Sequence, residues 1–438
     1  MPAIASHFAA QVLLISSAYA YLFSGIYKGV LGPLAGVDLT LVAGAVLVVL
    51  SLGISGRRVI QSVVSGPTLL LGSITAWMCL RLFPELSDFG IDKLQATVLL
   101  GAPAVLGGIA LARTEAINNV GWLAWAAVPL AIILMATSDS GQFAQLGTGG
   151  YFATGLLFAT LMVAGAASLN PVAFVAAAGG AAVTGNISGL VFGLFACGAA
   201  VSVLALRRSP QIARNVACAA FISVISLGGY VVATGGPPLV VSRTFQKAIS
   251  VVFVAAGMNE ETVVSGSGDL TPRRIGSEEA LTALGMPVGS QVTDVLDALV
   301  PEGTSANSGD RILMYSSAVQ HFLSCPAFGC GYGVPHYYSD LYPHNALLEL
   351  LAEGGILAGA LWIALMVVSA RACRNSPFAM GLLVLFALTS LTNGYWGGRM
   401  MLLSVGIAAG FAPPVTIRLR ALARRLYSGW QKSATTDR

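Results

Sequence analysis

Charged side chains are scarce in this 438-residue sequence, where Asp, Glu, Lys and Arg together make up only 10%. Soluble domains carry about 25% charged residues. Hydrophobic residues instead reach 56%, and the mean hydropathy is +0.79. This composition excludes a single water-soluble core. It predicts an all-α polytopic membrane protein, for which no nucleic-acid partner is expected.

Histidine and cysteine are also scarce, with four and six residues. The histidine spacings match no zinc-ligand pattern, so neither a metal nor another cofactor is expected. Four cysteines lie in or beside apolar runs, where they are expected to act as small apolar residues. Cys325 and Cys330 share a polar segment, so an oxidised pair is possible. The segment Cys-Pro-Ala-Phe-Gly-Cys closes only a tight turn, and the sequence leaves their redox state open.

Long apolar runs, by contrast, are abundant. Windows of about 20 residues predict about twelve transmembrane helices. The first lacks a basic n-region and a small-residue cleavage site, so it is expected to be retained. The stretch 170–189 is the least regular, because Asn-Pro and Gly-Gly pairs interrupt it. The predicted spans are residues 8–27, 36–54, 64–83, 95–112, 120–137, 151–168, 171–185, 189–206, 214–235, 346–370, 376–392 and 398–414.

Charge asymmetry orients these spans. With an even helix count, most arginines between spans fall on the same side as the basic tail, and the acidic residues of 85–92 fall on the other. Both termini are therefore predicted to be cytoplasmic. The predicted parts are transmembrane helices 1–9 (1–235), an extracytoplasmic loop domain with short helices (236–345), transmembrane helices 10–12 (346–414) and a basic cytoplasmic tail that touches anionic lipid (415–438).

The polar loop returns to an apolar helix at Tyr342-Pro343-His344-Asn345. Asn345, Glu349 and Glu353 recur at intervals of four residues, so they are expected to share one helix face. An ionisable group at the depth of Glu353 should face the bundle interior and have a partner. That partner could be an arginine in a structural ion pair, or Glu353 could act as a base.

The motifs between 308 and 357 resemble the O-antigen ligase and polymerase family of bacterial membrane glycosyltransferases. They are Ser308-Gly309-Asp310-Arg311, Tyr315, the glycine-rich turn at 326–333, and His344-Asn345 followed by nine residues and Gly355. Two departures stand out. Ala358 occupies a position where the ligase motif has Gly, Thr or Tyr. The segment 184–189 also lacks the arginine of the family's mid-chain Ser-Arg-Gly stretch, so another cation would have to replace it.

The resemblance implies a GT-C-like fold and glycosyl transfer at the periplasmic face of the bacterial inner membrane. The donor would be a glycan on undecaprenyl diphosphate. The acceptor would be lipid A-core in a ligase, or another lipid-linked glycan in a polymerase. The diphosphate leaving group must be stabilised beside a low-dielectric bilayer, and the permanently charged, forked arginine suits this role. Arg311 is the first candidate, followed by Arg243 and Arg399 near span ends.

His344 is the candidate catalytic residue, because a neutral imidazole can accept the proton of an attacking hydroxyl. Tyr342, Asn345, Glu349 and Glu353 are expected to support it. The tyrosines of 332–342 and Trp396 would either stack on sugar rings or form an interfacial aromatic belt.

Two other classes of protein remain open at this point. A secondary transporter or flippase could use the broken stretch 170–189 as a midplane site. A scaffold or receptor could use the large loop as a binding module. The polar residues gather at the predicted outer surface rather than along the spans, which favours the enzyme over the transporter.

Overall fold

The computed structural model describes residues 2–24, 26–27, 38–82, 88–118, 120–137, 146, 150–184, 188–206, 318–332, 345–393 and 396–414. These residues form helices and one isolated antiparallel bridge between Ser65 and Pro414. The helices are α1 (Pro2–Leu22), α3 (Leu39–Ser62), α4 (Gly66–Leu82), α5 (Asp88–Arg113), α6 (Gly121–Ala124), α7 (Ala127–Thr137), α8 (Gly150–Ala167), α9 (Pro171–Val183), α10 (Gly193–Leu206), α16 (Ala346–Cys373), α17 (Pro377–Asn393) and α18 (Arg399–Phe411), with a 3₁₀ turn η1 (Ala116–Asn118) and a π-helical turn η2 (Ser188–Phe192).

The predicted spans and the observed helices agree wherever they can be compared. A helix occupies every predicted span except 214–235, which lies outside the described residues. The span predicted at 120–137 is divided between α6 and α7. Within the described residues, three helical stretches are long and apolar enough to cross a membrane: Leu39–Ser62, Gly90–Arg113 and Ala346–Cys373. The all-helical membrane class is confirmed, while the count of twelve and the large loop at 236–345 stay predictions.

The irregular stretch at 170–189 is interrupted as its sequence indicates. The Asn170 Oδ1 accepts a hydrogen bond from the Ala173 amide at 3.1 Å and caps α9, with Pro171 at the first helical position. The helix ends at Val183, and the described chain resumes in the π-helical turn η2.

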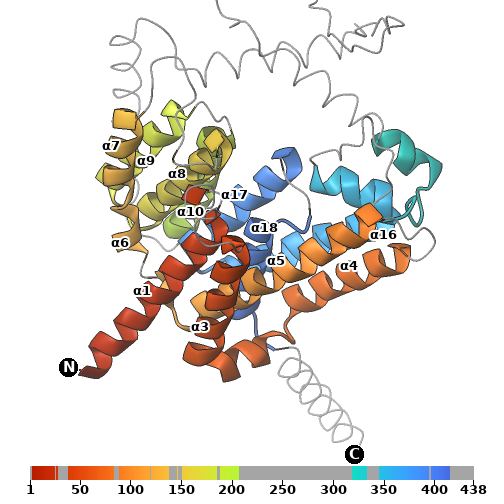
Figure 1. The fold of residues 1–438 in the computed structure, drawn as a ribbon, viewed down its shortest axis with the longest axis horizontal. Helices are drawn as coiled ribbons and strands as arrows, with labels where there is room; N and C mark the ends of the chain where they lie inside the picture. The colour runs from red at the N-terminus through yellow and green to blue at the C-terminus, as the bar shows by residue number, and fades with distance from the viewer. Residues whose placement is uncertain are drawn as a thin grey trace, which may run out of the picture.

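The centre of the bundle is built on the close approach of α5 and α18. A Cβ atom on Gly108 would meet the α18 backbone around Leu403, and a Cβ on Gly406 would meet the backbone of Val105. Glycines at such positions allow two transmembrane backbones to pack closely. Helices α4, α5 and α16 then lie side by side (Figure 1), and together they carry the polar residues discussed below.

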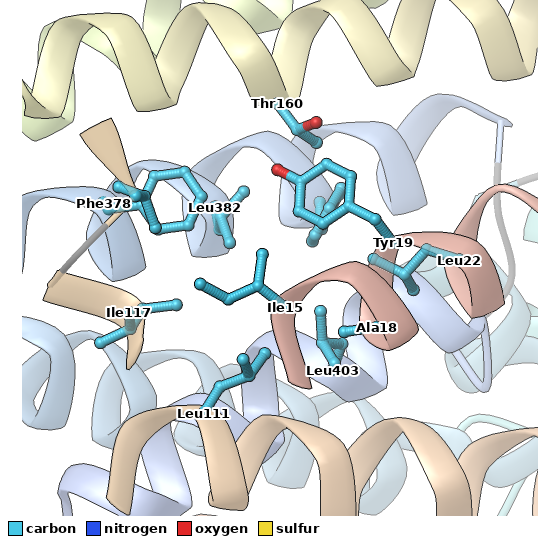
Figure 2. A pocket seen from close by; sticks show the side chains of 12 residues that line it. Ile15, Ala18, Tyr19, Leu22, Leu111, Ile117, Thr160, Phe378, Leu382 and Leu403 are labelled. Carbon is cyan, nitrogen blue, oxygen red and sulfur yellow. The ribbon is translucent and has the colours of Figure 1, made fainter. Parts of the chain in front are cut away.

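A small cavity of about 20 Å³ lies in the core between α1 and its neighbours (Figure 2). Its lining is apolar apart from the hydroxyls of Tyr19 and Thr160, which point toward one another. Small-molecule sites typically measure about 300–1,000 Å³. The cavity is therefore too small for a glycan, and the candidate site lies instead at the ends of the helices.

Polar contacts gather at the two opposite ends of α5. At its C-terminal end, the Arg113 Nε donates to the Ser62 hydroxyl at 2.7 Å, and an Nη donates to the Ala412 carbonyl at 3.3 Å. At its N-terminal end, Lys93 faces the start of α16. Arg113 and its hydrogen bonds thus lie at one end of α5. Lys93 and the start of α16, which follows the His344-Asn345 motif, lie at the other end.

Candidate functional site

Helix α16 begins with a side-chain cap. The Asn345 Oδ1 accepts hydrogen bonds from the amides of Leu347 and Leu348 at 3.1 and 3.0 Å. The Asn345 backbone is extended, with φ −137° and ψ 107°, as an N-cap residue requires. The predicted supporting residue Asn345 is thus engaged in fixing where α16 starts.

The helix is broken nearly three turns later, at Gly355. This residue has φ 71° and ψ −168°, a backbone conformation that favours glycine. A Cβ atom there would overlap the backbone of Ala327 and Gly329. Gly355 is the glycine that follows His344-Asn345 after nine residues. The structure therefore gives a physical reason for glycine at this position of the motif.

Residues 326–332, hereafter the bridging turn, fill the break. Their backbone supplies partners for groups that a continuous helix would pair internally. The bonds run from Cys330 N to Ala352 O (2.8 Å), from Gly331 N to Glu353 O (3.2 Å) and from Ile356 N to Pro326 O (2.9 Å). The turn and the break in α16 thus form one hydrogen-bonded unit.

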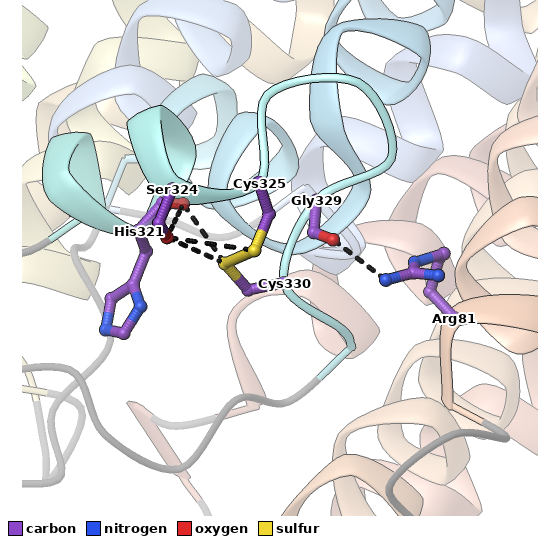
Figure 3. The surroundings of a disulfide bond; sticks show 6 residues. All are labelled: Arg81, His321, Ser324, Cys325, Gly329 and Cys330. Carbon is purple, nitrogen blue, oxygen red and sulfur yellow. Dashed lines mark hydrogen bonds between the residues drawn. A yellow bond between two sulfur atoms is a disulfide. The ribbon is translucent and has the colours of Figure 1, made fainter.

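A disulfide closes the bridging turn, joining Cys330 to Cys325 with their Cα atoms 5.3 Å apart (Figure 3). The sequence left this pairing open, and the structure forms it. The short helix at 318–324 precedes it, and the His321 carbonyl oxygen lies 3.1 Å from the Cys330 sulfur, which carries no proton in the disulfide. Gly329 has φ 75°, which allows the chain to reverse within so short a ring.

Helix α4 forms hydrogen bonds with both parts of this unit. The Trp77 Nε1 donates to the Gly354 carbonyl at 2.8 Å, next to the break. An Nη of Arg81 donates to the Gly329 carbonyl at 2.8 Å, and the Arg81 carbonyl accepts from the Tyr332 amide at 3.2 Å. Arg81 is therefore bound to the bridging turn, rather than only extending to the membrane interface.

Two buried carboxylates of α16 meet one lysine of α5. The Lys93 Nζ forms ion pairs with Glu349 and with Glu353, the latter at 2.6 Å. The lysine side chain is 9% exposed and both carboxylates are fully buried. The prediction that Glu349 and Glu353 share a face is confirmed. For Glu353, the structure shows an ion pair with the lysine Lys93, whereas the sequence left open an arginine partner or a role as a base.

Tyr332 covers the same lysine. The Lys93 Nζ lies 5.0 Å from the Tyr332 ring centroid, within the range of a cation–π contact. The ring also packs on Trp396, with centroids 6.4 Å apart. Burial raises the pKa of the Tyr332 hydroxyl, outweighing the Lys93 ammonium, which lowers it. Tyr332 and Trp396 are each only 2% exposed. Neither therefore offers a free ring face to a sugar or lies in an interfacial belt, and for these two residues both expectations are wrong.

The predicted diphosphate ligand Arg399 lies at the first position of α18. One Nη donates to the Ser24 hydroxyl at 2.9 Å, and the guanidinium lies 5.6 Å from the Tyr21 ring centroid. Through Trp396, which precedes α18, this helix start adjoins the ring of Tyr332. The remaining predicted site residues, His344, Arg311, Arg243 and Tyr342, lie outside the described part of the chain. Within that part, no group of three His, Cys, Asp or Glu residues could hold a metal.

Lys93 is the residue that the sequence reasoning missed. It lies just before the predicted span 95–112, beside Asp92. A lysine at such a position is expected to lie at the membrane interface. Its partners lie more than 250 positions later in the chain, and no local pattern connects them. The usable signal was the pair of acidic residues within an apolar helix, which requires a cation somewhere in the bundle.

The comparison with protein families agrees with this geometry. A family model described as O-antigen ligase matches residues 172–363, which include the bridging turn, the capped start of α16 and its break at Gly355. No curated protein matches the sequence. The matched segment contains the motifs that carry the resemblance, and apolar helices lie on both sides of it. The chain is therefore a membrane protein whose residues 172–363 match the family model described as O-antigen ligase.

Proposed function

We propose that the protein is an O-antigen ligase-type glycosyltransferase, which moves a glycan from undecaprenyl diphosphate to a hydroxyl of lipid A-core at the periplasmic face of the bacterial inner membrane. The observation that carries this proposal is the family match across 172–363. The backbone of Gly355, the motif glycine, supports it, because the strained break in α16 stands where the family motif has its glycine.

In this reaction His344 accepts the proton of the acceptor hydroxyl as that oxygen attacks the anomeric carbon. The bond between the anomeric carbon and the diphosphate breaks, and the lipid diphosphate leaves with its negative charge. Arg311, Arg243 and Arg399 are the proposed partners of that charge, since arginine binds phosphate oxygens through two donors at once. No metal or cofactor is part of the proposed chemistry.

The proposed topology follows from the two ends of α5. The end of α5 that carries Arg113, which bonds to Ser62 of α3, faces the cytoplasm together with both termini. The opposite end of α5 carries Lys93 beside the start of α16. It faces the periplasm, next to the proposed loop domain at 236–345. In this arrangement 1–235 and 346–414 are the two transmembrane parts, and 415–438 is the cytoplasmic tail.

A His344→Ala variant tests the catalytic assignment. Purified protein in lipid nanodiscs would be given a glycan on undecaprenyl diphosphate and lipid A-core, and the transferred glycan would be measured. His321→Ala is the matched control, because His321 belongs to the short helix before the disulfide. Loss of transfer in His344→Ala alone, at normal yield, supports the proposal. Unchanged transfer would remove His344 from the mechanism.

The choice between ligase and polymerase depends on the acceptor. Deletion of the gene followed by gel analysis of lipopolysaccharide separates the two. Core without attached O-antigen is the result expected of a missing ligase. Core that carries a single repeat unit would instead show that the enzyme extends a lipid-linked glycan.

A further inference from the structure

Lys93 is enclosed by the groups it contacts. Its ammonium faces two carboxylates and one aromatic ring, and the side chain is 9% exposed. A cation so placed has little surface left for a substrate phosphate. Its ammonium instead forms an ion pair with each of the carboxylates Glu349 and Glu353. Both ion pairs join described residues of α5 and α16.

Both carboxylates belong to one short part of α16, the stretch Asn345–Glu353 between the cap and the break. The break at Gly355 interrupts the helical hydrogen-bond ladder, so the longer remainder of α16 does not fix this stretch through continuous helix bonds. Contacts from outside the helix must orient it. The bridging turn holds its C-terminal end through Ala352 and Glu353, and Lys93 holds its side.

We propose that Lys93 is a positioning residue for glycosyl transfer: by pairing with Glu349 and Glu353, it fixes the stretch Asn345–Glu353 against α5. This inference rests on the proposed function, because the stretch carries the Asn345 cap of the family motif. The two ion pairs are the contacts through which Lys93 would hold this stretch. Removing the ammonium takes from two buried carboxylates the ion pairs that Lys93 makes with them, a loss that is relieved by protonation or by movement of the helix.

Two variants separate the charge of Lys93 from the length of its side chain. Lys93→Met keeps a chain of similar length without charge, and Lys93→Arg keeps the charge. Because displacement of reacting groups by about 1 Å can cost roughly 100-fold in rate, we expect kcat of Lys93→Met to fall by about 100-fold, while KM for the lipid-linked donor changes less than about threefold. Lys93→Arg should recover at least about a tenth of the wild-type kcat. A Lys93→Met enzyme with wild-type kcat would overturn the proposal.

A second measurement does not depend on activity. Hydrogen–deuterium exchange followed by mass spectrometry should show faster exchange of the amides of 345–353 in Lys93→Met, with α17 unchanged. Arg374→Met is the matched control, because it removes an exposed cation from the opposite end of the same helix and leaves Arg371 in place. The control should exchange and turn over like the wild type. Unchanged exchange at 345–353 in Lys93→Met would also overturn the proposal.

A third variant covers the case in which Lys93→Met does not fold. The triple variant Lys93→Met, Glu349→Gln, Glu353→Gln leaves no buried charge without a partner, so it should fold at normal yield. Neutral amides do not replace the ion pairs, and its kcat should stay as low as that expected of Lys93→Met. Wild-type kcat in the triple variant would show that the ion pairs do not position the helix.

The two proposals fail in different ways. If the wild type transfers no glycan to any acceptor while Lys93→Met still loses protection at 345–353, the proposed function is wrong and the anchoring by Lys93 stands. If the wild type is active and Lys93→Met is equally active, the proposed function stands and the role of Lys93 is wrong.

Discussion

The amide of Ile356 donates to the carbonyl of Pro326 at 2.9 Å, so a residue of a transmembrane helix is paired with a turn outside it. In an unbroken helix that amide would bond to Ala352, whose carbonyl instead accepts from Cys330. The exchange keeps the backbone groups of a break paired within an apolar helix, where unpaired groups would be costly. The break is therefore a stable part of the fold, and it ties the family's glycine-rich turn to the helix that carries its His-Asn motif.

The backbone of Gly355 gives the first prediction. Gly355→Ala should lower the thermal midpoint of the purified protein sharply, because this positive-φ, extended-ψ backbone is essentially restricted to glycine and costs other residues about 1–3 kcal/mol, and the new methyl group overlaps the bridging turn. Gly179→Ala is the control, since no atom lies within 4 Å of its Cβ position in α9. Scanning fluorimetry would compare the two. Equal midpoints for both variants would contradict the observed break.

The disulfide gives the second. A reductant should destabilise the wild type, because a bond that closes so short a ring contributes about 2 kcal/mol in the loop-entropy relation. The double variant Cys325→Ser, Cys330→Ser should melt at the same lower temperature with or without reductant. Cys79→Ser, which changes a free cysteine, should keep the response of the wild type. If reductant leaves the thermal midpoint of the wild type unchanged, Cys325 and Cys330 do not form a disulfide.

The two carboxylates of α16 should behave non-additively. Glu349→Gln and Glu353→Gln each leave Lys93 one partner, so each alone should destabilise only mildly. The double variant leaves a buried ammonium unpaired, which costs about 3–5 kcal/mol. Thermal unfolding of the single and double variants forms a double-mutant cycle. Asp92→Asn, at the exposed neighbour of Lys93, should have no effect, and additive losses would show that the carboxylates act separately.

Trp77 supplies the fourth. Trp77→Phe removes the hydrogen bond to the Gly354 carbonyl and should cost about 1 kcal/mol of stability. Trp125→Phe is a suitable control because that side chain is 52% exposed. Scanning fluorimetry would compare the thermal midpoints of the two variants with that of the wild type. A loss no larger than the control's would mean that α4 does not support the break through this bond.

Local pattern was enough to predict the helices and the shared face of Glu349 and Glu353, because each depends on neighbours within a few turns. Lys93 could not be assigned as their partner, since the ion pair depends on how α5 and α16 pack in three dimensions. The redox state of Cys325 and Cys330 likewise depended on how a folded turn places their Cα atoms. The roles of His344, Arg311 and Arg243 stay predictions, because these residues lie outside the described chain.

The bonds between the bridging turn and α16 are made by main-chain atoms, which has a consequence for engineering. The geometry demands glycine at Gly329 and Gly355, but it makes no comparable demand on Phe328, whose side chain is 60% exposed. A fluorophore or photo-crosslinker placed at that position would replace the ring that packs on Trp77, with centroids 5.9 Å apart, but no main-chain bond between the turn and α16. The turn is thus a natural place to attach a reporter of changes around the start of α16.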